Sequence, residues 1–231
     1  MPVPARLQEH ALMDLLYLHG LASSPGSTKA RFLARKLAPH GLALHCPDLN
    51  EPDFSSLTTT RMIGQVAALL LHLRGPVGLI GSSLGAFVAL HLAEYLCAEP
   101  DRTPVESLIL LAPAFDFGAA GMGRLGPGGL AHWRTQGWLE MPHYAYDETR
   151  RVHYELYADG GRYDSFGSRA AVPTLILQGR HDTVVDPAMV KRFAGARPHV
   201  RLVMLDDDHQ LKNSLDRVWF EIAAFLQLGE V

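Results

Sequence analysis

The chain has 231 residues, of which 48% are hydrophobic and 19% are charged, and its formal net charge is −3. This length allows one large domain or two small ones with a sizeable core, and the balance of residue types excludes a disordered chain. No basic run suggests nucleic acid as a partner, and no apolar stretch is long enough to enter and cross a bilayer.

The amino-terminal segment 1–10 lacks the basic and apolar regions of a secretory signal. The two cysteines, Cys46 and Cys97, lie far apart in the sequence, which excludes a disulfide framework. We expect both to be buried as small apolar groups, and we expect a cytoplasmic protein.

The first half of the chain alternates short apolar strands with helices. Ser27 or Thr28 can cap the first helix, which Pro39 and Gly41 should end. The expected strands are 12–18, 42–46, 77–80 and 107–111, and the expected helices after the first are 58–73 and 84–97. The helix at 84–97 is apolar on nearly every side, which is typical of a helix packed centrally against a sheet.

The pattern resumes near the carboxyl end of the chain after an interruption. The later strands are expected at 174–178 and 200–205, and the helices at 187–194 and 215–228. The alternation predicts an α/β protein with a mostly parallel sheet and helices on both faces. The intervening segment, Ala114–Val172, is rich in Gly and aromatic residues. We expect a single domain, 1–231, in which this segment is a cap insertion over the sheet.

A G-x-S-x-G pattern runs from Gly81 through Ser83 to Gly85, between an expected strand and an expected helix. In a nucleophile elbow the serine occupies a strained turn at the end of a strand, and the glycines let neighbouring elements approach. A glycine-rich turn of purely structural use is the alternative. The strand–turn–helix context favours Ser83 as a nucleophile.

A nucleophilic serine needs a base, and the base needs an orienting acid. Asp182 follows the strand at 174–178, and His209 follows the strand at 200–205. Since this is the chain order Ser, Asp, His at one sheet edge, we predict His209 as the base and Asp182 as the acid. Asp186 and the run 206–208 remain alternatives for the acid, although a solvated loop is the simpler interpretation of that run.

An oxyanion hole would need two backbone N–H groups. We assign them to Leu84, which follows the nucleophile, and to Leu21, which lies in the loop after the first strand. The neighbouring His19 is interpreted as a structural histidine that ties down this loop.

Other motifs give little support for a cofactor or a metal. The segment 121–126 matches G-x-G-x-x-G, but it follows no strand, and the Pro-Gly-Gly at 127–129 argues against a helix that would bind pyrophosphate. We interpret it as a lid linker. No metal-ligand spacing occurs among the histidines, so we expect neither metal nor cofactor.

Three strings carry a resemblance to known proteins. The opening run 17–30, Tyr-Leu-His-Gly-Leu-Ala-Ser-Ser-Pro-Gly-Ser-Thr-Lys-Ala, resembles the small bacterial esterases of the YqiA type. The run 137–142, the tyrosines after it and the run 81–85 are similar to the mitochondrial acyl-protein depalmitoylase and acyl-glucuronide esterase. Over nearly its whole length the chain resembles the α/β-hydrolase superfamily.

That resemblance implies an α/β-hydrolase fold with about six to seven strands and a short cap. It also implies a serine hydrolase of the carboxylesterase or thioesterase type, carried by Ser83, Asp182 and His209. The insertion looks longer than in the YqiA-type proteins, so the substrate cannot be transferred from them. An amide or carbon–carbon bond hydrolase, or a catalytically silent binding protein, are the alternatives.

The expected substrate is a small ester or thioester with an uncharged, apolar acyl group of short to medium length. Aromatic residues of the insertion and apolar loop residues should form its pocket, because ligand pockets are mainly apolar. We predict Leu21, Phe115, Trp138 and Tyr144 as substrate-binding residues. The sequence leaves the oligomeric state open.

Overall fold

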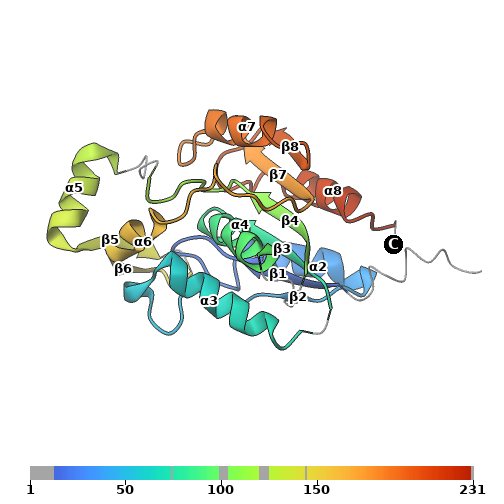
Figure 1. Cartoon of the computed structure of the whole chain (residues 1–231), viewed down its shortest axis with the longest axis horizontal. Helices are drawn as coiled ribbons and strands as arrows, with labels where there is room; N and C mark the ends of the chain where they lie inside the picture. Colours follow the sequence, from blue (N-terminus) through green and yellow to red (C-terminus); the bar gives the residue numbers. More distant parts are fainter. Residues whose placement is uncertain (1–12, 74, 99–103, 120–124, 144, 230–231) are drawn as a thin grey trace, which may run out of the picture.

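The computed structural model describes residues 13–73, 75–98, 104–119, 125–143 and 145–229. At its centre is a six-stranded sheet with the order β2-β1-β3-β4-β7-β8, in which every neighbouring pair is parallel (Figure 1). Its strands are β1 (Asp14–Leu18), β2 (Leu44–His45), β3 (Val77–Ser82), β4 (Val105–Leu111), β7 (Thr174–Gly179) and β8 (Val200–Leu205). The predicted α/β fold with a parallel sheet is confirmed.

Helices cover both faces of this sheet (Figure 1). They are α2 (Thr28–Leu37), α3 (Thr59–Leu70), α4 (Leu84–Cys97), α7 (Pro187–Gly195) and α8 (Leu215–Phe225), with short 3-10 turns at Ala38–His40 and Phe54–Ser56. The apolar side chains of α3, α4 and α7 pack in one core cluster, and those of α2 and α8 pack in a second.

The two core clusters follow from the alternation of side chains along each strand. In β1, Leu16 and Leu18 belong to the cluster under α4, whereas Leu15 and Tyr17 belong to the cluster under α2. All four are almost completely buried. A strand buried on both faces has no polar alternation, which is why the sequence shows it as a continuous apolar run.

The segment between β4 and β7 contains more regular structure than we expected. It forms α5 (Gly126–Gln136), a hairpin of β5 (Trp138–His143) and β6 (Glu148–His153), and α6 (Glu155–Gly160). In Figure 1 the helix α5 and the hairpin lie at the end of the molecule opposite α8. The side chain of Trp133 is fully buried, and its indole N–H donates to the Val152 carbonyl at 3.2 Å, joining the helix to the hairpin.

Two expectations are corrected here. The Pro-Gly-Gly run at 127–129 does not prevent a helix, because α5 runs through it. Helix propensity is a weak prior, and packing of the buried Trp133 outweighs it here. Most of the G-x-G-x-x-G string, 121–124, lies outside the described residues. Both cysteines were expected to be buried, but Cys97 is exposed at the last turn of α4 and Cys46 is half-buried.

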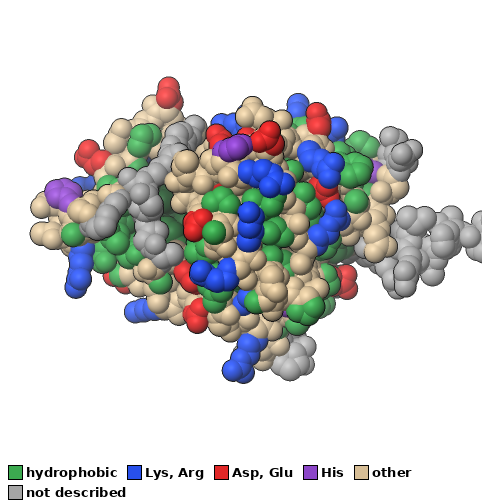
Figure 2. Space-filling view, turned by 90° about the horizontal axis from the view of Figure 1, so that it is seen from above, with side chains coloured by type: hydrophobic (Ala, Val, Ile, Leu, Met, Phe, Trp, Pro, Cys, Tyr) green, Lys and Arg blue, Asp and Glu red, His purple; other side chains and the backbone are tan. Residues whose placement is uncertain are grey.

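Within the described ranges, no helix is both long and apolar enough to cross a membrane. Figure 2 shows the face seen from above, on which Lys and Arg side chains lie among hydrophobic patches and scattered Asp and Glu side chains.

Candidate active site

Ser83 occupies a strained turn between β3 and α4. Its backbone has φ 54° and ψ −116°, a conformation that residues other than glycine rarely adopt. The turn is held from both sides: the Ser83 N–H donates to the Leu111 carbonyl at 2.9 Å, and the Ser83 carbonyl accepts the Ala86 N–H at 3.0 Å. The surroundings therefore fix the orientation in which the serine side chain leaves the sheet.

The glycines of the G-x-S-x-G string allow close approach of backbone. A Cβ at Gly85 would lie 2.0 Å from the carbonyl oxygen of Leu18 in β1, and a Cβ at Gly81 would lie 2.4 Å from Cα of Ala86 in α4. Only glycine fits at these two positions without moving the backbone. The close packing of β3 against α4, and of α4 against β1, therefore explains why glycine occupies both positions.

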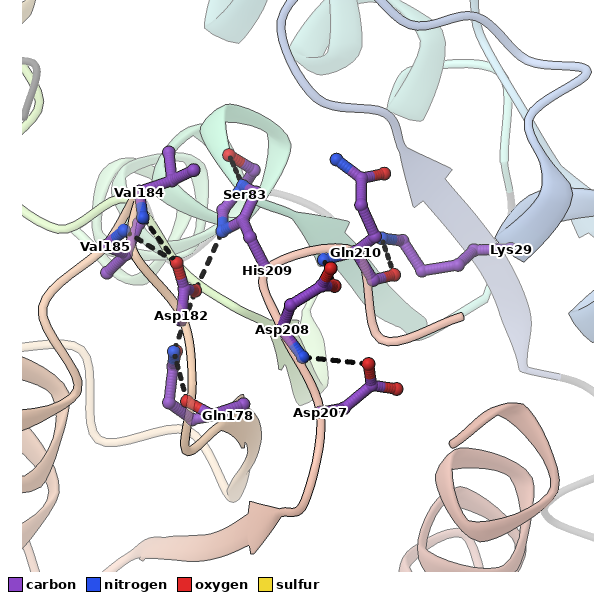
Figure 3. A network of polar contacts seen from close by, with 11 residues as sticks. Lys29, Ser83, Gln178, Asp182, Val184, Val185, Asp207, Asp208, His209 and Gln210 are labelled. Atoms are coloured by element: carbon purple, nitrogen blue, oxygen red, sulfur yellow. Dashed lines mark hydrogen bonds and ion pairs between the residues drawn. The ribbon is translucent and has the colours of Figure 1, made fainter. Parts of the chain in front are cut away.

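The three residues predicted as nucleophile, base and acid meet at the carboxyl edge of the sheet (Figure 3). His209 Nε2 lies 3.0 Å from Ser83 Oγ, and His209 Nδ1 lies 2.8 Å from Asp182 Oδ2. The His209 side chain is 12% exposed, and the Asp182 side chain is fully buried. This hydrogen-bonded chain joins loops that are 126 residues apart in sequence.

Four donors surround the Asp182 carboxylate. The backbone N–H groups of Val184 and Val185 both donate to Oδ1 at 2.8 Å, and Gln178 Nε2 donates to Oδ2 at 2.8 Å, beside the His209 ring (Figure 3). Burial raises the pKa of Asp182, but the hydrogen bonds from His209, Val185 and Gln178 outweigh it and hold the pKa below its usual value. The acid is therefore ionised and fixed in place.

The alternative acids have other partners. Asp207 Oδ1 accepts from the Asp208 N–H and from Asn213, and Asp208 Oδ1 accepts from the Gln210 N–H. The Asp206 carboxylate pairs with His181 on the surface. None of these three carboxylates has a hydrogen bond to His209 within the described residues, so they shape the loop that carries it.

The two residues assigned to the oxyanion hole, Leu84 and Leu21, line the same cavity as Ser83. The Leu84 N–H belongs to the first residue of α4, where a helix leaves its N–H groups without an internal partner. The loop of Leu21 touches the serine, since a Cβ at Gly20 would lie 3.3 Å from Ser83 Cβ. Neither N–H donates to another group in the described part of the chain.

His19 holds this loop, as its structural interpretation required. Its Nδ1 lies 3.0 Å from the Gly20 carbonyl, and its Nε2 accepts the Leu49 N–H at 3.0 Å. Burial lowers the pKa of His19, although the Gly20 carbonyl and the nearby Asp48 carboxylate oppose this effect. A neutral ring with its proton on Nδ1 satisfies both backbone contacts.

A cavity of about 1330 Å³ opens over Ser83 and His209. Leu21 and Phe115 line it, and Phe115 is stacked on Phe193 with ring centroids 3.9 Å apart. Tyr144 lies outside the described residues. Further apolar side chains line the cavity, among them Phe117, Leu125, Leu139, Met141, Val184, Val185 and Met189.

Trp138 differs from the expectation, because it does not line the cavity. Its ring is 39% exposed and packs against His153 and the guanidinium of Arg151 on the hairpin. In β5 the side chains alternate, so Leu139 and Met141 pack towards the core while Trp138 lies on the opposite face. Recognising 138–143 as a strand would have assigned the inward face correctly.

Sequence reasoning also missed several polar residues of the site. Gln178, near the carboxyl end of β7, donates to the Asp182 carboxylate, and Lys29 and Lys212 line the cavity. A buried Gln within an apolar strand is a usable signal, because buried amides need partners. The two lysines have no such signal, since they stand 183 positions apart and meet only through the fold.

Comparisons with known proteins place the whole chain in one fold family. A candidate hydrolase from Agrobacterium vitis S4 superposes with a TM-score of 0.82 and 26% identity, over 97% of this chain and 91% of that one. Mouse alpha/beta hydrolase domain-containing protein 10 has a TM-score of 0.75 and 21% identity, with 93% and 89% covered. Est1E from Butyrivibrio proteoclasticus, solved with ferulic acid bound, has a TM-score of 0.72 and 18% identity, with 98% and 92% covered.

No curated protein matches the chain. A family model described as "Uncharacterised protein family (UPF0227)" matches residues 14–227, which is nearly the whole chain. The resemblance drawn from the sequence is therefore confirmed at the level of fold and family. The chain is a member of the UPF0227 family and has the α/β-hydrolase fold.

Proposed function

We propose that the protein is a serine hydrolase that cleaves carboxylic esters or thioesters. Ser83 is the nucleophile, His209 the general base, and Asp182 the acid that orients the base. The observation that carries the proposal is the pair of hydrogen bonds, 3.0 Å and 2.8 Å long, that runs from Ser83 Oγ through the His209 ring to a buried carboxylate. The fold shared with Est1E, which binds ferulic acid, gives independent support.

In the acylation step, Ser83 Oγ attacks the carbonyl carbon while His209 Nε2 takes its proton. Asp182 accepts the Nδ1–H bond, which keeps Nε2 free to act as the base and stabilises the imidazolium. The carbonyl oxygen becomes an oxyanion beside the N–H groups of Leu84 and Leu21. His209 then returns the proton to the departing alcohol or thiol, and the acyl group remains on Ser83.

In the deacylation step, water takes the place of the leaving group. His209 removes a proton from that water, and the resulting hydroxide attacks the acyl carbon. The second tetrahedral intermediate collapses, the carboxylic acid leaves, and the proton returns to Ser83 Oγ. Each step uses the same three side chains and the same two backbone N–H groups.

The acyl group that suits the cavity is uncharged and apolar. Phe115, Leu139 and Met141 line it from the segment after β4, and Leu21 and Val184 line it from the loops beside the triad. Burial of each added methylene in such a pocket contributes about 0.8 kcal/mol. We therefore expect kcat/KM to rise with acyl length along an ester series until the cavity is filled, and a flat series would contradict this assignment.

Labelling with a fluorophosphonate probe tests the nucleophile directly. Ser83→Ala should abolish labelling and lower p-nitrophenyl butanoate hydrolysis by a factor of about 10⁴ to 10⁶, with an unchanged circular dichroism spectrum. Ser82→Ala, the neighbouring substitution, should keep both activities. Labelling that survives in Ser83→Ala and disappears in Ser82→Ala would overturn the assignment, and no labelling in the wild type would favour a binding protein.

A further inference from the structure

Four cationic side chains line the cavity that contains Ser83. Lys29 and Arg31 come from α2, Arg192 from α7, and Lys212 from the loop that follows His209. Within the described residues, none of the four forms an ion pair with a carboxylate. Lys29 is half-buried and the other three are exposed, so Lys29 is the cation that most needs a counter-charge, because a desolvated charge without one is costly.

Lys29 is the most buried of these cations, and it is bonded to the loop that carries His209. Its Nζ donates to the Gln210 carbonyl at 2.8 Å, one residue after His209 (Figure 3). An ammonium group has three N–H donors, and this bond uses one. Burial and the charge of Lys212 lower the pKa of Lys29 to about 8, although nearby Asp carboxylates oppose them. Keeping Lys29 protonated in the folded protein therefore lowers the free energy of unfolding.

The acidic residues that line the cavity are Glu140, Asp182 and Asp186; Asp182 is bonded to His209, and Asp186 accepts from the Ala188 N–H at the start of α7. Asp207 and Asp208 accept hydrogen bonds from the backbone of their own loop, and neither lines the cavity. Lys212, Ser24 and Thr28 line the same cavity as Lys29. This set of two ammonium groups and two hydroxyl-bearing residues can satisfy the oxygens of a carboxylate or a phosphate.

The position of His209 shows which part of a substrate would meet these lysines. His209 must protonate the leaving group, so the alcohol or thiol part of the substrate lies against its ring. Lys29 is bonded to the next residue, Gln210, and Lys212 stands three positions after His209. Lys29 and Lys212 are thus tied to the loop that carries the residue proposed to protonate the leaving group.

We propose that Lys29 and Lys212 form an anion subsite for the leaving group, so that the preferred substrate is an ester or thioester whose alcohol or thiol part carries a carboxylate or a phosphate. This inference rests on the proposed hydrolase function and specifies its substrate class. It is compatible with an apolar acyl group, because the side chains of Leu139 and Met141 line the cavity from β5.

Three butanoate esters that differ only at the far end of the leaving group test the subsite. They are 4-carboxyphenyl, 4-phosphonooxyphenyl and neutral 4-carbamoylphenyl butanoate. The quantity to compare is the ratio of kcat/KM for each anionic ester to kcat/KM for the neutral ester, at pH 7 and low ionic strength. Electronic differences between the leaving groups cancel when this ratio is compared between wild type and variant.

Lys29→Met and Lys212→Met should each lower this ratio about tenfold, the loss expected when one charge-assisted hydrogen bond is removed. Lys36→Met is the matched control, because Lys36 lies on the same helix outside the cavity, and it should leave the ratio unchanged. If Lys29→Met does not fold, Lys29→Gln removes the charge and keeps a donor for the Gln210 carbonyl.

A fall for the carboxylate ester, the phosphate ester or both supports the subsite and identifies its anion. A ratio that stays unchanged for both anions in either lysine variant overturns the proposal. In particular, equal losses on charged and neutral esters in Lys29→Met would mean that Lys29 only holds the loop of His209. Failure of the hydrolase function itself would look different: wild type would cleave none of the three esters, and Ser83 would not react with a fluorophosphonate.

Discussion

Replacing Asp182 by Asn exchanges one carboxylate oxygen for an NH₂ group at a fully buried position. The carboxylate accepts two backbone N–H groups on Oδ1 and the side chains of Gln178 and His209 on Oδ2. An amide can place its oxygen only on one of these two sides. With the oxygen towards the backbone, its NH₂ group faces Gln178 and His209.

The consequence for catalysis comes through the tautomer of His209. Its Nδ1 must accept a hydrogen bond from the amide that replaces the carboxylate, so the ring proton moves to Nε2, which faces Ser83 Oγ at 3.0 Å. A protonated Nε2 cannot take the serine proton, and the expected loss in kcat is about 10⁴-fold. The Gln178 donor also loses its acceptor, which costs about 1–3 kcal/mol of unfolding free energy.

Asp207→Asn provides the control that separates catalysis from stability. Asp207 is also buried and accepts hydrogen bonds from Asp208 and Asn213, but it does not contact His209. Both variants should unfold at lower urea concentration than the wild type, and only Asp182→Asn should lose fluorophosphonate labelling and ester hydrolysis. Near-normal labelling of Asp182→Asn, or a larger loss in Asp207→Asn, would refute this reasoning.

Three further predictions concern backbone packing at Gly85, the side chains that line the cavity, and the pH dependence of stability. Gly85→Ala places a Cβ 2.0 Å from a backbone carbonyl of β1, so we expect a loss of about 1–3 kcal/mol or more from overpacking, visible as a lower Tm or insoluble protein. Met141→Ala should reduce kcat/KM for longer acyl esters, whereas Trp138→Ala should not, because only Met141 lines the cavity; equal losses would contradict the orientation of β5. The pKa values of Asp182 and Asp207 are lowered in the folded protein, so the stability they provide is complete above about pH 4 and is lost as pH falls through the lowered values. Urea midpoints measured from pH 6 to pH 2.5 should fall less steeply for Asp207→Asn than for the wild type, and parallel curves would exclude this contribution.

Strands buried on both faces and the loops at their ends could be predicted well from the sequence. The helix at 84–97 and the strand at 200–205 have the predicted bounds, since a sharp change in apolar character marks each end. His209 and Asp182 could be located because they follow predicted parallel strands, whose carboxyl ends meet at one edge. The geometry that joins them to Ser83 could not be read from the sequence.

The segment between β4 and β7 resisted prediction for two physical reasons. Its helix α5 contains glycines of low helix propensity, and burial of Trp133 stabilises it through tertiary contacts that are invisible locally. Its strand β5 contains a proline, and the adjacent apolar residues Trp138 and Leu139 interrupt the alternation of polar and apolar residues in its sequence. Lys29 and Gln178 were missed because their importance depends on neighbours from other elements.

The order of strands in the sheet has an evolutionary consequence. β4 and β7 are adjacent and paired from Leu108 and Thr174 onwards, although the whole hairpin-containing segment separates them along the chain. Because the two strands are parallel, that segment leaves at the carboxyl end of β4 and re-enters at the amino end of β7, and its length can change without altering the register between the two strands. Changes in this segment can therefore alter the lining of the cavity while Ser83, His209 and Asp182 stay in place, and a graft of this segment from a relative would test whether it sets the proposed substrate preference.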